Sequence, residues 1–133
     1  MSAAQVSPPP QFVPGARHRL EPERRAITHK FRIAGHKGYL TVGLYPDGSP
    51  GEIFLRMAKC GSTLSGLLDS LAVAVSLGLQ HGISLQTFAD KYIAARFEPM
   101  GHSGEEFGEA SSIVDYCFRW LTKKFPTAGT VTH

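Results

Sequence analysis

The sequence is poor in cysteine and in charged residues, and it has no long apolar run. Only two of its 133 residues are cysteines, too few for the disulfide framework that holds many small secreted domains together. No uninterrupted apolar stretch approaches the roughly 18 residues that cross a bilayer, so we expect no contact with a membrane. The first 15 residues carry neither a positive charge nor an apolar core, unlike a secretory signal. We therefore expect a reducing, cytoplasmic location.

Residues that build metal and catalytic sites are also scarce. The six histidines and two cysteines are scattered along the chain, whereas zinc sites pair such ligands at short spacing. Neither the Gly-x-Ser-x-Gly elbow of many hydrolases nor the Walker phosphate loop occurs. We expect the chain to hold no metal and to contribute no catalytic residue.

The net charge of +3 is concentrated near the N-terminus. Residues 1–40 hold seven lysines and arginines and two glutamates, whereas residues 41–133 hold seven basic and nine acidic residues. A basic segment of this kind can bind phosphates or an acidic partner, and it is equally typical of an ordinary solvated surface. Composition leaves both interpretations open.

The chain is long enough for one domain with a core and too short for two ordinary domains. Residues 1–16 contain four of the nine prolines among small and polar residues, which predicts a disordered tail. We divide the remainder into a basic lead-in at 17–26, a single folded domain at 27–126 and a frayed end at 127–133.

Three segments at the start of this domain alternate between polar and apolar residues, which is the period of a half-buried strand. They lie at 28–34, 39–45 and 52–57. Short stretches rich in glycine and proline separate them and predict turns. Consecutive strands with short links predict an antiparallel meander.

After the third strand, the apolar period changes to that of a helix. Helices are predicted at about 63–80, 85–93 and 109–124, with Gly82 ending the first and Ser84 capping the second. The first helix is apolar nearly all round, so we expect it to be the buried central helix. The sequence thus predicts the α+β class, a three-stranded antiparallel meander followed by three helices, with the first helix buried.

The segment between the third strand and the first helix is the best candidate for a binding site. Unpaired backbone N–H groups at a helix start favour anions. Lys59 adds positive charge, Gly61 lets a ligand approach the backbone, and hydroxyls follow at Ser62 and Thr63. We hypothesise that these four residues bind a phosphate or another anion, with Arg25 contributing charge. The alternative is that Ser62 or Thr63 only caps the helix.

Two further features each have a structural and a functional interpretation. Arg96 and Glu98 can form a buried ion pair that holds their loop to the second helix, or Arg96 can face a phosphate. Cys60, beside a lysine at the helix start, is either a reactive thiol or an ordinary cysteine. Cys117 lies on an apolar helical face, which predicts a small core residue.

Several long blocks cover about four fifths of the chain, from Arg17 to about Phe125. They are RHRLEPERRAITHKFRI, GHKGYLTVGLYPDGSPGEIFLRMAK, GSTLSGLLDSLAVAVSLGLQHGISL, RFEPMG and SIVDYCFRWL. These blocks resemble the C-terminal region of cobalamin-dependent (class II) ribonucleotide reductases. That region is a small domain named TSCPD after a cysteine-bearing motif, and the cysteines of the motif are absent around Arg96 to Pro99.

The resemblance implies both a function and its limits. In those reductases the radical chemistry, the substrate pocket and the adenosylcobalamin site lie in a large upstream barrel, for which this sequence has no counterpart. We therefore expect a non-catalytic accessory or split component, related to ribonucleoside-diphosphate reductase and the supply of DNA precursors. We expect it to bind no cofactor by itself.

The resemblance also implies a partner. We expect the large chain of a class II ribonucleotide reductase, and association between copies of the chain stays open. The alternative is a repurposed module that binds nucleotides, RNA or DNA through the basic N-terminal segment and the helix start at 59–63. Salt separates the two, because phosphate binding weakens steeply as salt rises.

Overall fold

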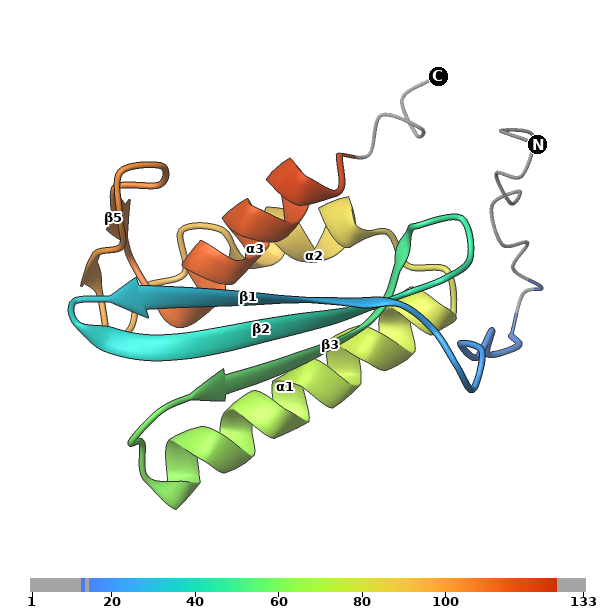
Figure 1. Ribbon diagram of the computed structural model, residues 1–133, viewed down its shortest axis with the longest axis horizontal. Helices are drawn as coiled ribbons and strands as arrows, with labels where there is room; N and C mark the ends of the chain where they lie inside the picture. Colours follow the sequence, from blue (N-terminus) through green and yellow to red (C-terminus); the bar gives the residue numbers. More distant parts are fainter. Residues whose placement is uncertain (1–12, 14, 127–133) are drawn as a thin grey trace.

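The computed structural model describes residue 13 and residues 15–126, which form a sheet flanked by helices (Figure 1). The elements, in chain order, are β1 (Ala26–Ile33), β2 (His36–Leu44), β3 (Pro50–Met57), α1 (Ser62–Gln80), α2 (Leu85–Tyr92), β4 (Gly101–His102), β5 (Glu109–Ala110) and α3 (Ile113–Lys124). The predicted α+β class and the antiparallel meander followed by helices are confirmed. Most of the predicted tail at 1–16, and all of the predicted frayed end at 127–133, lie outside the described residues.

Strands β1, β2 and β3 pair in sequence order, each antiparallel to the next. Because side chains alternate between the two faces, one face of the sheet is apolar and buried. Its buried members are Phe31, Ile33, Leu40, Val42, Leu44, Ile53, Leu55 and Met57. α3 covers this face, since Trp120 stacks on His29 with ring centroids 4.5 Å apart and Tyr116 stacks on Phe31 at 4.8 Å.

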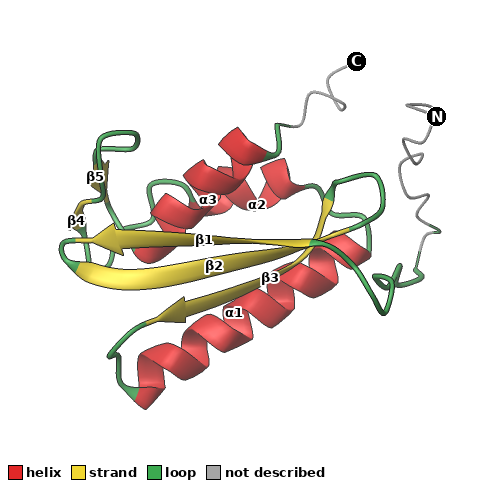
Figure 2. Cartoon of the chain, viewed as in Figure 1, coloured by secondary structure: helices red, strands yellow, loops and turns green. Residues whose placement is uncertain are grey.

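α1 lies alongside β3 (Figure 2), and near its end Gly78 contacts Phe88 of α2. The expectation that α1 is the buried central helix is wrong, because only one face of it is covered and Leu67 and Val73 are 64% and 59% exposed. α3 is the deeply buried helix, with eight of its twelve residues buried. The physical reason is that α1 packs along β3 through one stripe, Leu68, Ala72, Val75 and Leu79, which joins the core shared with α3, and its other faces stay uncovered.

Polar side chains of α1 close the open edge of β3. Ser76 Oγ accepts a hydrogen bond from Ile53 N at 2.9 Å and donates one to Ile53 O at 3.2 Å. Gln80, which is buried, donates from Nε2 to Gly51 O at 2.9 Å. Unpaired strand edges are prone to pair with other chains, so these contacts both attach α1 and protect the sheet.

By length and mean hydropathy alone, α1 meets the criteria for a membrane-spanning helix, with 19 residues at a mean hydropathy of 1.5. Polar residues interrupt its apolar positions, and a single helix of this kind is weak evidence for a membrane span. Core helices of globular proteins pass the same criteria. In this fold, α1 buries Leu68, Ala72 and Val75 within the domain.

The predicted boundary between α1 and α2 is confirmed. Gly82 has a φ of 93°, and Ile83 N donates to Gly78 O at 2.9 Å, which is the closure expected after a helix with glycine in the left-handed region. Ser84 Oγ accepts a hydrogen bond from Thr87 N at 3.1 Å and so caps α2.

The predicted start of the last helix is wrong by one turn. Instead of joining α3, Glu109 and Ala110 form β5, which pairs with β4 inside the segment predicted as loop. Ser112 Oγ accepts a hydrogen bond from Asp115 N at 2.9 Å and sets the true start at Ile113. Apolar periodicity does not locate a helix start, whereas a side-chain cap does, and strands of two residues are too short to show alternation.

Candidate functional site

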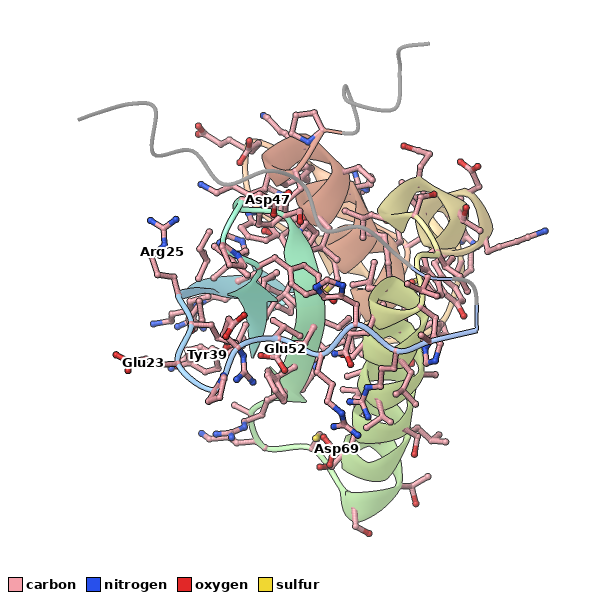
Figure 3. The ribbon with its side chains drawn as sticks, turned by 90° about the vertical axis from the view of Figure 1, so that its right-hand side faces the viewer. Glu23, Arg25, Tyr39, Asp47, Glu52 and Asp69 are labelled. Carbon is pink, nitrogen blue, oxygen red and sulfur yellow. The ribbon has the colours of Figure 1, made fainter. Side chains whose placement is uncertain are left out.

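The second face of the sheet is turned away from α3 and is largely polar. Figure 3 shows Tyr39 and Glu52 on this face and Asp69 extending from α1 on the same side. We call it the outer face. The strand register assigns to it Ala26, Thr28, Lys30, Arg32, Lys37, Tyr39, Thr41, Gly43, Glu52, Phe54 and Arg56. Four cations, two aromatic rings and a single carboxylate therefore share one surface.

Positive charge on the outer face is not neutralised by its own carboxylate. Glu52 Oε2 accepts a hydrogen bond from Arg24 Nε at 2.7 Å, and this bond raises the pKa of Arg24. Across residues 15–126, none of the ion pairs involves the four cations of the outer face. The surface therefore keeps an excess of positive charge available to an anionic ligand.

The strand register places these cations beside the aromatic rings. Lys30 pairs with Tyr39, and Tyr39 pairs with Arg56, so the phenol ring lies between two cations across the sheet. Phe54 pairs with Thr41 and is a diagonal neighbour of Tyr39, roughly 7–8 Å away by ordinary sheet geometry. Phe54 is 54% exposed, so its ring is available for contact.

A groove of about 600 Å³ runs between the outer face and α1. Phe54 lines it from the sheet, and Val73 and Leu77 line it from the helix. Arg56 and Asp69 bring opposite charges to the same groove. Apolar walls with a few polar groups are the usual composition of a ligand site.

The predicted anion site at the start of α1 is formed only in part. Gly61 is the N-cap residue, and no side-chain hydrogen bond caps the helix. Ser62 and Thr63 are exposed, so the alternative in which one of them caps α1 is not what the structure has. Lys59 is exposed and has a φ of 55°. These four residues remain an untested hypothesis for an anion site.

Arg25 is not brought to that site. It directly precedes β1 at the end of the sheet where Ala26 and Glu52 flank Gly43. Lys59 follows the opposite end of β3, beyond Met57. The five strand residues between these two ends span roughly 17 Å, so Arg25 cannot act together with Lys59 on a single phosphate.

The predicted ion pair between Arg96 and Glu98 is also corrected. Both residues are exposed, and among the contacts of the described chain neither an ion pair nor a hydrogen bond joins them. Buried Asp115 holds this loop in their place, because its carboxylate accepts hydrogen bonds from Ala94 N at 2.7 Å and Ser111 N at 3.1 Å. An ion pair in solvent adds little to the stability of a fold, whereas a buried carboxylate that accepts hydrogen bonds from backbone N–H groups adds more.

Arg119 completes this network, which our sequence reasoning missed. Its Nη2 donates to Asp115 Oδ2 at 2.9 Å and to Glu109 O at 2.8 Å, and its Nη1 donates to Phe107 O at 2.9 Å. One available signal was the spacing of an acid and a base four residues apart on a helix. The network fixes α3, β5 and the preceding loop together and is structural.

His29 is a second half-buried polar group that the sequence did not reveal. Its Nε2 lies 2.9 Å from Tyr116 Oη, and its ring stacks on Trp120. Burial lowers the pKa of His29 and raises the pKa of Tyr116 to about 12. This cluster joins β1 to α3.

The two cysteines have different surroundings. Cys60 is half-buried, and its Sγ donates to Met57 O at 3.3 Å. Cys117 is buried, as predicted, and burial raises the pKa of its thiol. Within the part of the chain that the structure describes, no group of three or more His, Cys, Asp or Glu residues is placed to hold a metal ion.

The fold and this surface define a small α+β domain with a charged sheet face and one partly uncovered helix. The TSCPD domain family matches residues 10–125. The chain belongs to this family, which confirms the resemblance seen in the sequence.

Curated relatives at high identity are vitamin B12-dependent ribonucleotide reductases. That of Rhodopirellula baltica is 54% identical over 106 residues, covering 79% of this chain and 10% of the relative. That of Streptomyces avermitilis is 46% identical over 110 residues, covering 82% and 11%, and that of Agrobacterium fabrum is 37% identical over 119 residues, covering 88% and 9%. The chain thus matches about a tenth of the length of these relatives. No solved structure matches it.

Proposed function

We propose that this chain is a non-catalytic accessory component of a B12-dependent ribonucleotide reductase and docks onto the reductase large chain through α1. The relatives named as such reductases contain the matching region within a chain about ten times its matched length. A region that is part of a long chain in relatives has a natural partner in the remainder of such a chain. In this proposal the large chain holds the cobalamin and carries the chemistry.

The observation that supports docking is the uncovered face of α1. Leu67, Val73 and Leu77 are 64%, 59% and 38% exposed. Asp69 is the only charged residue among the 19 residues of α1. Apolar surface without interspersed charge marks protein–protein contact sites on soluble domains. The outward face of α1 therefore fits an apolar surface of a partner chain.

The environments of the two cysteines support a non-catalytic role. The resemblance to class II reductases implies that their chemistry needs reactive thiols. Cys117 is buried, and burial holds its thiol in the protonated form. Cys60 donates its hydrogen to a backbone carbonyl and has no second cysteine beside it, since the other cysteine belongs to the core.

A tagged copy of the 133-residue chain, expressed in its own cells, tests the docking proposal. We expect mass spectrometry to identify the large chain of a B12-dependent ribonucleotide reductase, and we expect its recovery to survive nuclease treatment. The double variant Leu67→Glu/Val73→Glu should lose the reductase at least tenfold. The matched control is Phe97→Glu, which places the same charge at an exposed apolar position away from α1 and should retain it.

Three outcomes contradict the proposal. The first is recovery of no reductase chain with the unmodified protein, and the second is equal recovery with the α1 variant. The third uses the apolar character of α1. If neutral phosphatidylcholine vesicles bind the chain and the double variant abolishes this binding, the face belongs to a membrane contact.

A further inference from the structure

We propose that the outer face of the sheet binds single-stranded nucleic acid, with its cations on phosphates and its two aromatic rings against bases. The inference is argued from the sheet residues of the outer face, which meets the α1 docking face at the groove beside Val73 and Leu77. It does not depend on association with a reductase. It also uses residues other than those of the helix start at 59–63.

The positions of the two aromatic rings support stacking against bases. Tyr39 and Phe54 are diagonal neighbours on adjacent strands of an open sheet face. Single-stranded nucleic acids are bound by rings exposed in this way, because every base has a face that can stack. Phe54 is 54% exposed, so about half of its surface is open to a ligand.

The positions of the four cations support contacts with phosphates. Lys30 and Arg56 flank Tyr39 across the strands, and Arg32 pairs with Lys37 two residues further along the same face. The cations therefore surround the aromatic platform on several sides. In the structure's described region their charge is not used in ion pairs, so phosphates can bind without displacing an internal partner.

The carboxylates give the bound strand a preferred side. Asp69 lies in the groove on the α1 side, and Glu52 is at one end of the face, already bonded to Arg24. A phosphate is repelled by Asp69, whereas amino groups on base edges can donate to its carboxylate. The phosphates are thus expected over β1 and β2, with bases directed toward Phe54 and the groove.

The same features disfavour an acidic peptide as the ligand. Charge alone would attract such a peptide, but it offers no planar groups to cover Tyr39 and Phe54. A duplex keeps its bases stacked internally and cannot present them to the rings. We therefore expect a single strand to bind more tightly than a duplex of equal length, and RNA and DNA strands to bind alike.

Fluorescence anisotropy with the full chain and a labelled 12-nucleotide strand of mixed sequence tests the proposal. The double variant Lys30→Ala/Arg32→Ala should weaken binding and reduce the slope of log K against log salt by about 1.4, the value for two lost phosphate contacts on a single strand. Its matched control is Lys91→Ala/Lys124→Ala, which removes the same charge from exposed positions off the outer face and should leave most of the slope.

Phe54→Ala tests the stacking contribution separately. We expect a loss of about tenfold in affinity at every salt concentration, because a base–ring contact is not ionic. Phe97→Ala removes an exposed ring elsewhere and should have no effect. Circular dichroism on each variant establishes that it is folded before binding is compared.

The proposal is overturned if the strand does not bind at 50 mM salt. It is also overturned if the two charge variants weaken binding equally, since binding would then follow net charge alone. Equal affinity for a duplex, or for a poly-glutamate peptide of the same charge, would assign the face to polyanions in general and reject the stacking role. Unchanged affinity in Phe54→Ala would reject it as well.

Discussion

Asp115 and Arg119 lie one turn apart on α3, and Arg119 Nη2 donates to Asp115 Oδ2 at 2.9 Å within a half-buried network. The same carboxylate accepts backbone hydrogen bonds from the loop after α2. One acidic side chain therefore holds together three segments that are separate in sequence. The loop that contains Arg96 and Glu98 is thus positioned by a residue of α3 that lies outside the loop.

This arrangement predicts that Asp115→Ala is strongly destabilising. The change leaves Ala94 N and Ser111 N without their acceptor and removes the carboxylate partner of Arg119. We expect the free energy of unfolding to fall by about 2–4 kcal/mol, as measured by urea denaturation. Asp90→Ala, at an exposed carboxylate on α2, should change it by less than about 0.5 kcal/mol. Equal effects of the two changes would refute the role of the network.

The surroundings of Gly38 and Gly66 predict opposite effects on stability when each glycine is replaced by alanine. A Cβ on Gly38 would lie 2.5 Å from both Met57 Sδ and Phe31 Cζ, so Gly38→Ala should cost about 1–3 kcal/mol of stability through overpacking. A Cβ on Gly66 in exposed α1 meets nothing within 4 Å. Gly66→Ala should therefore stabilise the domain by up to about 1 kcal/mol. Thermal unfolding of both variants gives the two signs directly, and matching signs would contradict the packing described here.

Ser76→Ala should loosen the contact between α1 and the edge of β3. The change removes the hydroxyl that bonds Ile53 N and Ile53 O, at a cost of about 1 kcal/mol. Hydrogen exchange at the Ile53 amide should become faster, because its partner is lost. Ser70→Ala, at an exposed position of the same helix, is the control and should leave exchange at Ile53 unchanged.

Stability should decrease as the pH falls below about 6.5, the ordinary pKa of histidine. Burial lowers the pKa of His29 in the folded state, so in this range the unfolded chain binds more protons and protonation favours unfolding. His29→Gln should flatten this part of the stability curve. His36→Gln, at an exposed histidine, should leave the slope in place. Urea midpoints between pH 5 and 8 measure both, and an unchanged slope in His29→Gln would exclude this assignment.

Local signals in the sequence located most of the elements correctly. The alternation of Lys30, Phe31 and Arg32 depends only on neighbours, as does the glycine at Gly82 that ends α1. The start of α3 was misplaced because the cap at Ser112 competes with equally plausible polar residues before it. Family membership was also readable from sequence, because long blocks of residue identity do not require a structure.

Only the tertiary structure decided which surfaces of the elements stay uncovered after packing. An apolar helix such as α1 has no sequence signal for how many of its faces will be covered. In the folded domain only the stripe with Leu68, Ala72 and Val75 is covered, which leaves Leu67 and Val73 exposed. The separation of Arg25 from Lys59, and the meeting of Lys30, Tyr39 and Arg56, follow from strand register. The sequence by itself determined the elements and the family, since both rest on short-range patterns. The candidate binding surfaces depend on contacts between distant residues, and those are set only when the elements pack.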